Sequence, residues 1–507
     1  MAKSILQHYI KTVGLDQIQA GAAAFYASLD QVQTVSPSIA KAIAKELNDQ
    51  RTHLKLIASE NYCSLATQLA CGNLFTDKYA EGIAGHRFYA GCENVDDVEM
   101  EASSLARELF GAEHVYVQPH SGADANLVAF LAILSARVQA PILERLGEKD
   151  LYKLKPSDWS ELRRQFGNQR LLGMNYYAGG HLTHGYRHNI SSRLFEVAHY
   201  GVDEQTGLVD LDQVRAQAKE FKPLILLAGY SAYPRRLNFA KLREIADEVN
   251  AVLMVDMAHF SGLVAGKVFV GDDNPVAHAH VVTSTTHKTL RGPRGGLVLC
   301  NKEFAPWVDK GCPAILGGPL PHVMASKAIA FREALEPSFR EYAQRVVDNA
   351  KALAEALGEQ GVPVLTNGTD NHIVLIDVHK GFGLSGRQAE TALRECRMTL
   401  NRNSLPNDPN GAWYTSGLRL GTAAVSTIGL QKEHMQEIAS VIKRVLSNTK
   451  PAEVTQGDKK GQQSLAKYTL PAGVRDEAHQ RVSAIMAEHR PYPDLDIGIL
   501  RTAGLLD

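Results

Sequence analysis

The sequence predicts an α/β fold in which a large, mostly parallel sheet is followed by a smaller α/β region. Apolar runs at Phe195–Ala198, Leu224–Ala228 and Val252–Asp256 have the length and composition of buried strands. The helical pattern Phe239–Val249 lies between the last two of these runs. Because strands that alternate with helices pair in parallel, we expect functional side chains at the carboxyl ends of these strands.

The composition is that of a globular protein, since 45% of the 507 residues are apolar, and the length is enough for two or three domains. The formal net charge of -1 gives no electrostatic reason to expect nucleic acid or an anionic membrane as a partner. No apolar run approaches the ~18 residues of a membrane span, so we expect none. Six scattered cysteines without a C-x-x-C pair favour reduced thiols in a cytoplasm, and we expect no metal site.

The chain is divided into four parts. We assign residues 1–75 to an N-terminal helical arm, 76–338 to a large domain, 339–450 to a small C-terminal domain and 451–507 to a linker and tail. Within the last part, residues 451–463 have the composition of a linker and residues 474–489 have a helical pattern. The polar, charged segment 137–173 resembles an insertion in the large domain.

A turn between a strand and a helix could hold a phosphate. The helical pattern Val95–Phe110 is followed by the short strand Val115–Val117, which runs through PHSGADAN into the apolar helix Leu127–Leu134. Backbone N–H groups of Gly122 and Ala123 would point out of the helix N-terminus, where the helix dipole favours an anion. An ordinary turn is the alternative, since many strand–helix turns contain Gly and Ser.

The stretch VVTSTTHKTLRGPRGGLVL, residues 281–299, indicates a strand, a polar loop with a tight turn, and a second strand. It places Lys288 among Ser and Thr residues near a strand end. A lysine there can form a Schiff base with an aldehyde, and pyridoxal phosphate is the aldehyde that proteins most often hold in this way. Most lysines are merely solvated, so this hypothesis depends on the neighbouring residues.

Other polar residues follow predicted strands and fit the same hypothesis. Asp256 comes directly after four apolar residues, and a buried carboxylate there could keep a pyridine nitrogen protonated or could bind a loop N–H instead. Ser231 and His259 lie at neighbouring strand ends. His181, in GGHLTHG, could lie flat on a planar ring or be an ordinary loop histidine. Arg419, in TSGLRLGT, could clamp a carboxylate.

Eight short motifs then occur in order between Leu54 and Thr422: LIASENY, KYAEG, GGHLTHG, VDMAH, TTHKTLRGPRGG, TDNH, NDP and TSGLRLGT. Together they resemble the serine hydroxymethyltransferase family, pyridoxal-phosphate enzymes of the aspartate-aminotransferase fold (fold type I). The resemblance implies a seven-stranded, mostly parallel sheet in the large domain and a smaller C-terminal α/β domain. It also implies reversible conversion of L-serine and tetrahydrofolate to glycine and 5,10-methylenetetrahydrofolate in the cytoplasm, in one-carbon metabolism and glycine biosynthesis.

The resemblance also implies roles around the cofactor. Pyridoxal phosphate would be bound covalently to Lys288, with Asp256 at the pyridine nitrogen, His181 on one ring face and Ala258 on the other. The remaining cofactor-binding residues would contact the phosphate, the ring hydroxyl or the nearby backbone, and they are Gly122, Ala123, Ser231, His259, Thr285 and Tyr79. His287 would take part in catalysis beside Lys288, and Arg294 would support the site structurally.

For the substrates, the resemblance implies that Ser59 and Arg419 hold the amino-acid carboxylate and that Leu182 and Asn403 contact tetrahydrofolate, the co-substrate. Glu81 is similar to the family's acid/base group at the hydroxymethyl carbon, and Tyr89 matches a tyrosine near it. In the family, the loop that carries Tyr79 and Glu81 comes from a neighbouring subunit. The smallest complete enzyme would therefore be a homodimer, and a tetramer of dimers is the alternative.

The sequence departs from the family pattern at several places. Ala123 stands where a phosphate-binding serine is usual, and Ala178 replaces a common histidine. The segment before Gly317-Gly318 is shorter than the usual phosphate loop. The insertion at 137–173 precedes a site loop. The residues after about 495 extend past the usual end, and both an ordered and a disordered tail stay open.

Two other functions stay open at this point. A threonine aldolase or another glycine-handling pyridoxal enzyme would share the fold, although Glu81 and the folate positions argue against it. A relative that has lost its chemistry would act by binding alone, although Lys288, Asp256 and Arg419 are all present.

Overall fold

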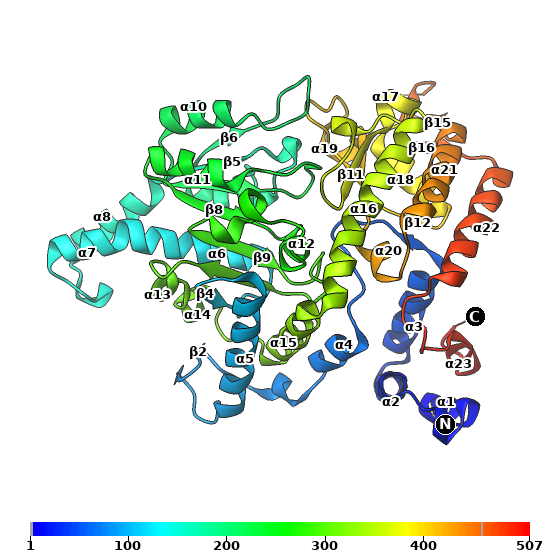
Figure 1. Cartoon of the computed structure of the whole chain (residues 1–507), viewed down its shortest axis with the longest axis horizontal. Helices are drawn as coiled ribbons and strands as arrows, with labels where there is room; N and C mark the ends of the chain where they lie inside the picture. Colours follow the sequence, from blue (N-terminus) through cyan, green and yellow to red (C-terminus); the bar gives the residue numbers. More distant parts are fainter. Residues whose placement is uncertain (1–3, 458–459, 507) are drawn as a thin grey trace.

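The computed structural model describes residues 4–457 and 460–506. A seven-stranded sheet with the order β4-β10-β9-β8-β7-β5-β6 forms the centre of the large domain, as predicted (Figure 1). β10 is antiparallel to both of its neighbours, β4 and β9, and all other pairs in the sheet are parallel. Its strands are β4 (His114–Tyr116), β5 (Arg170–Met174), β6 (Glu196–Tyr200), β7 (Ile225–Gly229), β8 (Val252–Asp256), β9 (Val281–Thr285) and β10 (Gly296–Cys300).

The central strands are buried on both faces because helices cover each side of the sheet. Leu226 and Val255 point into one apolar core, and their neighbours Leu227 and Met254 point into the other, as the two-residue period of a strand requires. The first core also includes α5 (Glu93–Phe110), α10 (Leu211–Phe221), α11 (Phe239–Glu248), α12 (Ser261–Ala265) and α15 (Pro321–Leu335). The second core includes α6 (Gly122–Leu134), α7 (Ala140–Leu146), α8 (Pro156–Gly167) and α13 (Ala305–Val308).

The α6 helix corrects the expectation that no segment is long enough to span a membrane. It continues through a π-helical turn, Ser135–Gln139, into α7, and the helix Gly122–Leu146 has the length and apolar composition of a span. It packs against β9 and β10, and 61% of its most apolar window is buried inside the protein. A buried core helix meets the same criteria, and this is the role that α6 has here.

The predicted insertion 137–173 contains less irregular structure than its composition indicated. Its end is β5, a buried strand of the central sheet, and its start continues α6. Only the part with α7 and α8 projects from the body of the large domain (Figure 1, cyan). The predicted end was wrong because the short run RLLGM is hidden by the charged residues that precede it, and the predicted start was wrong because the helix that begins as α6 continues past residue 137.

The small domain is built on an antiparallel sheet with the order β11-β14-β13. Its strands are β11 (Ile373–Asp377), β13 (Asn401–Asn403) and β14 (Gly417–Gly421), and its main helices are α16 (Pro337–Glu359), α18 (Gly386–Glu395), α21 (Lys432–Asn448) and α22 (Ala472–Glu488). A second, parallel pair joins β1 (Leu54–Lys55) to β12 (Met398–Thr399). Leu54 and Leu56 are fully buried in the core of the small domain. The helical arm expected over residues 1–75 is therefore interrupted by a strand that belongs to another domain.

The two ends of the chain pack together. The helices α1 (Ile5–Val13), α2 (Ala20–Val35), α3 (Pro37–Thr52) and α23 (Ile497–Thr502) share one apolar cluster, and the Tyr26 hydroxyl donates to the Asp496 carbonyl over 3.0 Å. The sequence left open whether the residues after about 495 are ordered, and Leu495, Leu500 and Leu505 are buried in this cluster. Residues 1–3 and 507 lie outside the described residues.

The predicted linker 451–463 is part of a β-hairpin made by β15 (Lys450–Glu453) and β16 (Gln463–Thr469). Gln388 of α18 fixes the hairpin by donating its amide to the carbonyls of Ser464 and Lys467 over 2.6 and 2.7 Å. Residues 458–459 of the predicted linker lie outside the described residues. The other short elements are α4 (Leu65–Cys71), α9 (Ser191–Leu194), α14 (Gly311–Ala314), α17 (Val378–Phe382), α19 (Gly411–Tyr414), α20 (Ala423–Thr427), β2 (Gly82–Ile83) and β3 (His86–Arg87).

Candidate active site

Lys288 lies just after β9, in the loop that leads to β10, and its side chain is partly buried. Asn61 fixes this loop by donating its amide to the Lys288 carbonyl over 2.9 Å. Burial lowers the pKa of the Lys288 amine to about 8, and the charges of Arg419 and Arg294 act in the same direction while the Asp256 carboxylate opposes them. The neutral amine is the form that attacks an aldehyde, so its lowered pKa suits Lys288 to bind the predicted cofactor.

Asp256 ends β8 and is 7% exposed. Three donors point at its carboxylate, namely the Asn126 amide at 3.0 Å, His184 Nε2 at 3.3 Å and the Ala258 backbone N–H at 3.0 Å. Burial alone would raise the pKa of Asp256, but the hydrogen bond from His184, with the proximity of His181 and Asn126, holds this pKa well below its usual range. Asp256 is therefore ionised at neutral pH, as the partner of a protonated pyridine nitrogen has to be.

The proton position on His184 follows from its two partners. Nδ1 of His184 accepts the backbone N–H of His181 over 3.4 Å, so the proton of the neutral ring lies on Nε2, which donates to Asp256.

His181 is oriented by a chain of hydrogen bonds. The Asn126 amide donates to the Thr183 hydroxyl over 2.7 Å, and this hydroxyl lies 2.8 Å from His181 Nδ1. The Thr183 backbone N–H donates to the same nitrogen over 3.3 Å. Burial lowers the pKa of His181 to about 4, so the ring is neutral at pH 7 and can stack on a planar ring.

His259 and His372 form a buried pair between the two domains. His259 Nδ1 lies 3.3 Å from His372 Nε2, and the two rings are stacked with their centroids 5.5 Å apart. Burial lowers the pKa of both rings, that of His372 to about 3, so neither is charged at pH 7. Beside them, the Thr285 hydroxyl donates to the Ala258 carbonyl over 3.1 Å, which ties the end of β9 to the loop that follows β8.

The N-terminus of α6 fits a phosphate. Ser121 is the N-cap residue, and its hydroxyl accepts the Asp124 N–H over 3.1 Å while it donates to the Asp124 carboxylate over 2.8 Å. Within residues 4–457 and 460–506, the N–H groups of Gly122 and Ala123 form no hydrogen bond, as expected for the first turn of a helix. A Cβ at Gly122 would lie 2.7 Å from Thr285 Cγ2, so only glycine leaves this cradle open.

Arg419 reaches the site from the small domain. Its Nε donates to the Asn401 amide oxygen over 3.1 Å, and its Nη1 donates to the Ser231 carbonyl over 2.6 Å. Burial lowers the pKa of Arg419 to about 10, so the guanidinium is still charged at pH 7. A cavity of about 250 Å³ opens beside it, and its lining includes His181, Leu182, Ser231, Asn403 and Arg419.

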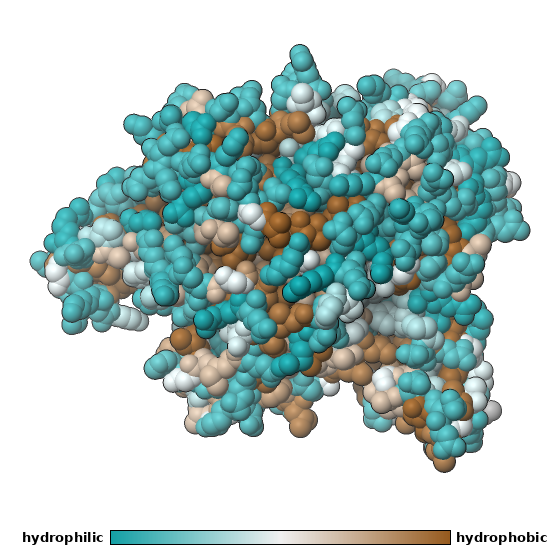
Figure 2. Space-filling model, in the orientation of Figure 1, coloured by the Kyte–Doolittle hydropathy of each residue, from teal (hydrophilic) through white to brown (hydrophobic). Residues whose placement is uncertain are grey.

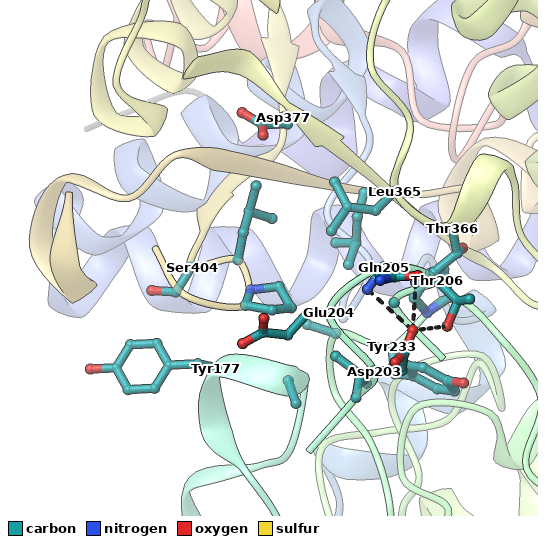
Figure 3. A pocket seen from close by; sticks show the side chains of 18 residues that line it. Tyr177, Asp203, Glu204, Gln205, Thr206, Tyr233, Leu365, Thr366, Asp377 and Ser404 are labelled. Atoms are coloured by element: carbon teal, nitrogen blue, oxygen red, sulfur yellow. Dashed lines mark hydrogen bonds between the residues drawn. The ribbon is translucent and has the colours of Figure 1, made fainter. Parts of the chain in front are cut away.

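A second cavity, of about 230 Å³, adjoins the first and shares Ala232 and Ser404 with it (Figure 3). Asp203 and Glu204 line it, and Asp377 lines it from the small domain. The Asp203 carboxylate accepts the hydroxyl and the N–H of Thr206, each over 2.8 Å. The carboxylates of this lining disfavour an anionic ligand, so an amino-acid carboxylate is better accommodated in the first cavity, beside Arg419.

Three further predicted residues lie at the edge of the site. Ser59 follows Ala58, whose Cα would lie 2.3 Å from a Cβ at Gly421, so Ser59 is near the end of the strand that carries Arg419. His287 Nδ1 is buried without a hydrogen-bond partner among the described residues, which fits the binding of a further group beside Lys288. Burial lowers the pKa of His287 to about 3. Arg294 is exposed.

Within one chain, Glu81 makes no hydrogen bond or ion pair with Lys288 among the described residues. Glu81 accepts the Tyr79 hydroxyl over 3.4 Å, and it makes no ion pair in the part of the chain that the structure describes. The Tyr79 ring lies against Gly318 and 4.9 Å from the Tyr89 ring, measured between centroids. Both tyrosines are about half exposed. Figure 2 shows apolar patches between hydrophilic ones along the lower edge of the molecule, the edge at which Figure 1 places β2.

Sequence reasoning missed the residues that orient the predicted ones, namely Asn126, His184, His372 and Asn401. The first three stand in motifs that were noticed, PHSGADAN, GGHLTHG and TDNH. Their partners lie far away in the sequence, as Asn126 and Asp256 do, so no local pattern indicates the contact.

These groups fit pyridoxal phosphate. A lysine with a lowered pKa, an ionised buried carboxylate, a neutral ring oriented by hydrogen bonds and an open cradle of N–H groups are what its aldehyde, pyridine nitrogen, ring face and phosphate require.

Comparison with known proteins agrees with this geometry. A family model described as serine hydroxymethyltransferase matches residues 32–143 and 165–442, and the unmatched interval lies within the predicted insertion. A serine hydroxymethyltransferase of Treponema pallidum is 57% identical over 99% of this chain and 86% of its own length. One of Mycolicibacterium smegmatis is 57% identical over 96% of this chain and 97% of its own length. One of Chlamydia trachomatis serovar D is 48% identical over 98% of this chain and 99% of its own length. The matches confirm the resemblance found in the motifs, and the chain belongs to the serine hydroxymethyltransferase family.

Proposed function

We propose that the enzyme works at the cavity beside Arg419, with Lys288 and Asp256 at the reacting end. The activity itself is that of the family: a pyridoxal-phosphate-dependent transferase that converts L-serine and tetrahydrofolate to glycine and 5,10-methylenetetrahydrofolate. The observation that carries the assignment of the site is that Lys288, which follows β9, lies close enough to Asp256 at the end of β8 and to Arg419 within β14 for both charges to act on its amine.

In this proposal, Lys288 binds the cofactor aldehyde and Asp256 holds the proton of the pyridine nitrogen. When bound, pyridoxal phosphate withdraws electrons from the Cα of the amino acid. His181 covers one ring face and Ala258 the other, and the open N–H groups of Gly122 and Ala123 receive the phosphate. His259 and Thr285 stand at neighbouring strand ends, which supports their roles next to the ring. His287 is proposed to contact the reacting groups through its unpartnered Nδ1.

Arg419 is proposed to hold the substrate carboxylate, with Ser59 beside it. Two of the guanidinium nitrogens are already bound to Asn401 and Ser231, so the guanidinium is fixed before substrate arrives. Leu182 and Asn403 are proposed to contact tetrahydrofolate, and both line the same cavity. A substrate held at Arg419 would then lie between the lysine and the folate.

Glu81 is proposed to act in the site of a second copy of the chain, with Tyr79 and Tyr89 beside it. Within one chain Glu81 makes no hydrogen bond to the Lys288 group, as far as the described residues go. The region around it is rich in exposed apolar side chains, which would be covered in a dimer. The exposed residues are Leu74, Tyr79, Phe88, Tyr89 and Met100.

A homodimer is thus the proposed working unit. A cytoplasmic location is proposed from the cysteines, all six of which are free in the structure. The large and small domains are proposed to lie on either side of the cavity, because its lining includes Ser231 from one side and Asn403 from the other.

Complementation between inactive subunits tests the proposed site. Lys288→Ala and Glu81→Gln should each be inactive alone in a serine-to-glycine assay with tetrahydrofolate. Co-expressed, they form mixed dimers in which one of two sites has both residues, so activity should return to about a quarter of the wild-type value for random pairing. If both residues act in one chain, mixing cannot restore activity, and the proposal is wrong.

A further inference from the structure

Lys327 is a buried lysine outside the site described above. It lies on α15 and is 1% exposed. Its ammonium donates to three backbone carbonyls, those of Val117 at 2.5 Å, Pro119 at 3.0 Å and Gly296 at 2.8 Å. Three donors are thus matched by three acceptors, which is the complete hydrogen-bonding capacity of a lysine.

The three carbonyls belong to two segments that both lead to the cofactor site. Val117 and Pro119 follow β4 and directly precede the turn Ser121–Ala123 at the N-terminus of α6. Gly296 begins β10, at the end of the loop that carries Lys288. The two segments also touch directly, because the Gly296 N–H donates to the Pro119 carbonyl over 2.9 Å.

Gly295 provides the room for this lysine, because a Cβ there would lie 2.5 Å from Lys327 Cε. Gly296 lets the two segments approach each other, because a Cβ there would lie 2.2 Å from the Ser121 carbonyl oxygen. Among the described residues Lys327 has no carboxylate within ion-pair distance, so its partners are the three carbonyls. Burial lowers the pKa of the Lys327 amine, opposed by Glu99 and Cys71, but a neutral amine has only two N–H donors, so the three carbonyls favour the ammonium.

Converging carbonyl oxygens repel one another unless a donor lies between them. Without the ammonium, the carbonyls of Val117 and Gly296 would lose the only side-chain donor that they share, in an interior where water cannot easily replace it. The strand end before the turn would then relax away from β10, and the N–H groups of Gly122 and Ala123 would lose their position.

We propose that Lys327 is a positioning residue for the cofactor phosphate: it fixes the turn Ser121–Ala123 relative to the loop of Lys288 by holding three carbonyls together. The inference rests on the proposed role of this turn as the phosphate site.

The test compares two ligands that differ only in the phosphate. Full-length enzyme with Lys327→Met keeps a side chain of similar length but has no donor. Its dissociation constants for pyridoxal phosphate and for pyridoxal, which lacks the phosphate, are measured by equilibrium dialysis. We expect affinity for pyridoxal phosphate to fall about tenfold or more, with less than about a twofold change for pyridoxal.

Ser326→Ala is the matched control. Ser326 is the preceding residue of the same helix, is fully buried, and donates to the Thr67 carbonyl over 2.6 Å, away from the turn. This variant should bind both ligands as the wild type does. Unchanged pyridoxal phosphate affinity in Lys327→Met, or an equal loss for the two ligands, would overturn the inference.

A second variant keeps the test decisive if Lys327→Met does not fold. Gly295→Ala retains the ammonium but pushes its Cε away from the carbonyls, so affinity for pyridoxal phosphate should fall selectively here too. Unchanged affinity in this variant would refute the role of Lys327. If the wild-type enzyme binds pyridoxal as tightly as pyridoxal phosphate, the turn is not the phosphate site, and both that assignment and the inference about Lys327 are wrong.

Discussion

The reactivity of Lys288 should rise steeply with pH and then level off near pH 8, well below the range of an ordinary lysine. Its pKa is lowered to about 8, from 10.5, chiefly by burial. At pH 7 about a tenth of such an amine is neutral, against ~0.03% of an ordinary lysine, which is a difference of roughly 300-fold. From pH 6 to 7 the neutral fraction rises about ninefold, but from pH 8 to 9 it rises less than about twofold.

Trace acetylation of the cofactor-free, full-length protein measures this fraction directly. The yield of acetyl-Lys288 is read by mass spectrometry at each pH, and the yield for a free lysine derivative in the same tube shows how an ordinary amine responds. Lysine derivatives in solution should keep gaining about tenfold per pH unit up to pH 10, while Lys288 should reach its plateau earlier.

Two substitutions should move the midpoint pH of the Lys288 titration in opposite directions. The Asp256 carboxylate raises the pKa of Lys288, so Asp256→Asn should move the midpoint to lower pH. The Arg419 guanidinium lowers this pKa, so Arg419→Gln should move the midpoint to higher pH. A tenfold gain per unit up to pH 10 in the wild type, or shifts of the opposite sign in the variants, would refute the electrostatic account of Lys288.

Three further substitutions test the proposed roles. Lys288→Ala should abolish multiple turnover, and near-normal turnover in a serine assay would refute the assignment of Lys288 as the lysine that binds the cofactor. Glu81→Gln should lower folate-dependent serine cleavage about 10²–10⁴-fold while cofactor affinity, measured by titration, is unchanged; a parallel loss of both would make Glu81 structural. Ala123→Ser adds a hydroxyl at an exposed position of the phosphate turn and should tighten pyridoxal phosphate binding about tenfold, as measured by titration of the cofactor-free protein. Equal or weaker binding would mean that the phosphate already has its partners.

The central sheet could be predicted from sequence because its strands are buried on both faces and therefore appear as unbroken apolar runs. One example is VLMV, the first four residues of β8. The pair β1–β12 could not be predicted, since a strand of two residues has no period to detect. The hairpin β15–β16 was missed for a different reason: its polar sequence gains its order from Gln388, a residue of another element.

The site likewise has residues that could be predicted from the sequence and residues that could not. Lys288 and Asp256 follow recognisable strands, so their places near strand ends could be predicted. Arg419 was indicated only by its motif, and it lies within β14. The positioning residues could not be predicted, because Asn126 and Lys327 contact atoms more than a hundred residues away in the chain. Their importance depends on three-dimensional proximity, which a single sequence does not contain.

The pairing of β1 with β12 has a consequence for how the chain acquires its structure. Leu54 and Leu56, which complete the core of the small domain, are synthesised nearly 300 residues before the rest of that domain begins. A fragment that starts after the large domain would therefore lack two core side chains and one strand, and we expect it to fold poorly alone. The core of the small domain can be completed only after the ribosome has released most of the protein. Contacts between distant parts of the chain therefore set the folding rate of this domain.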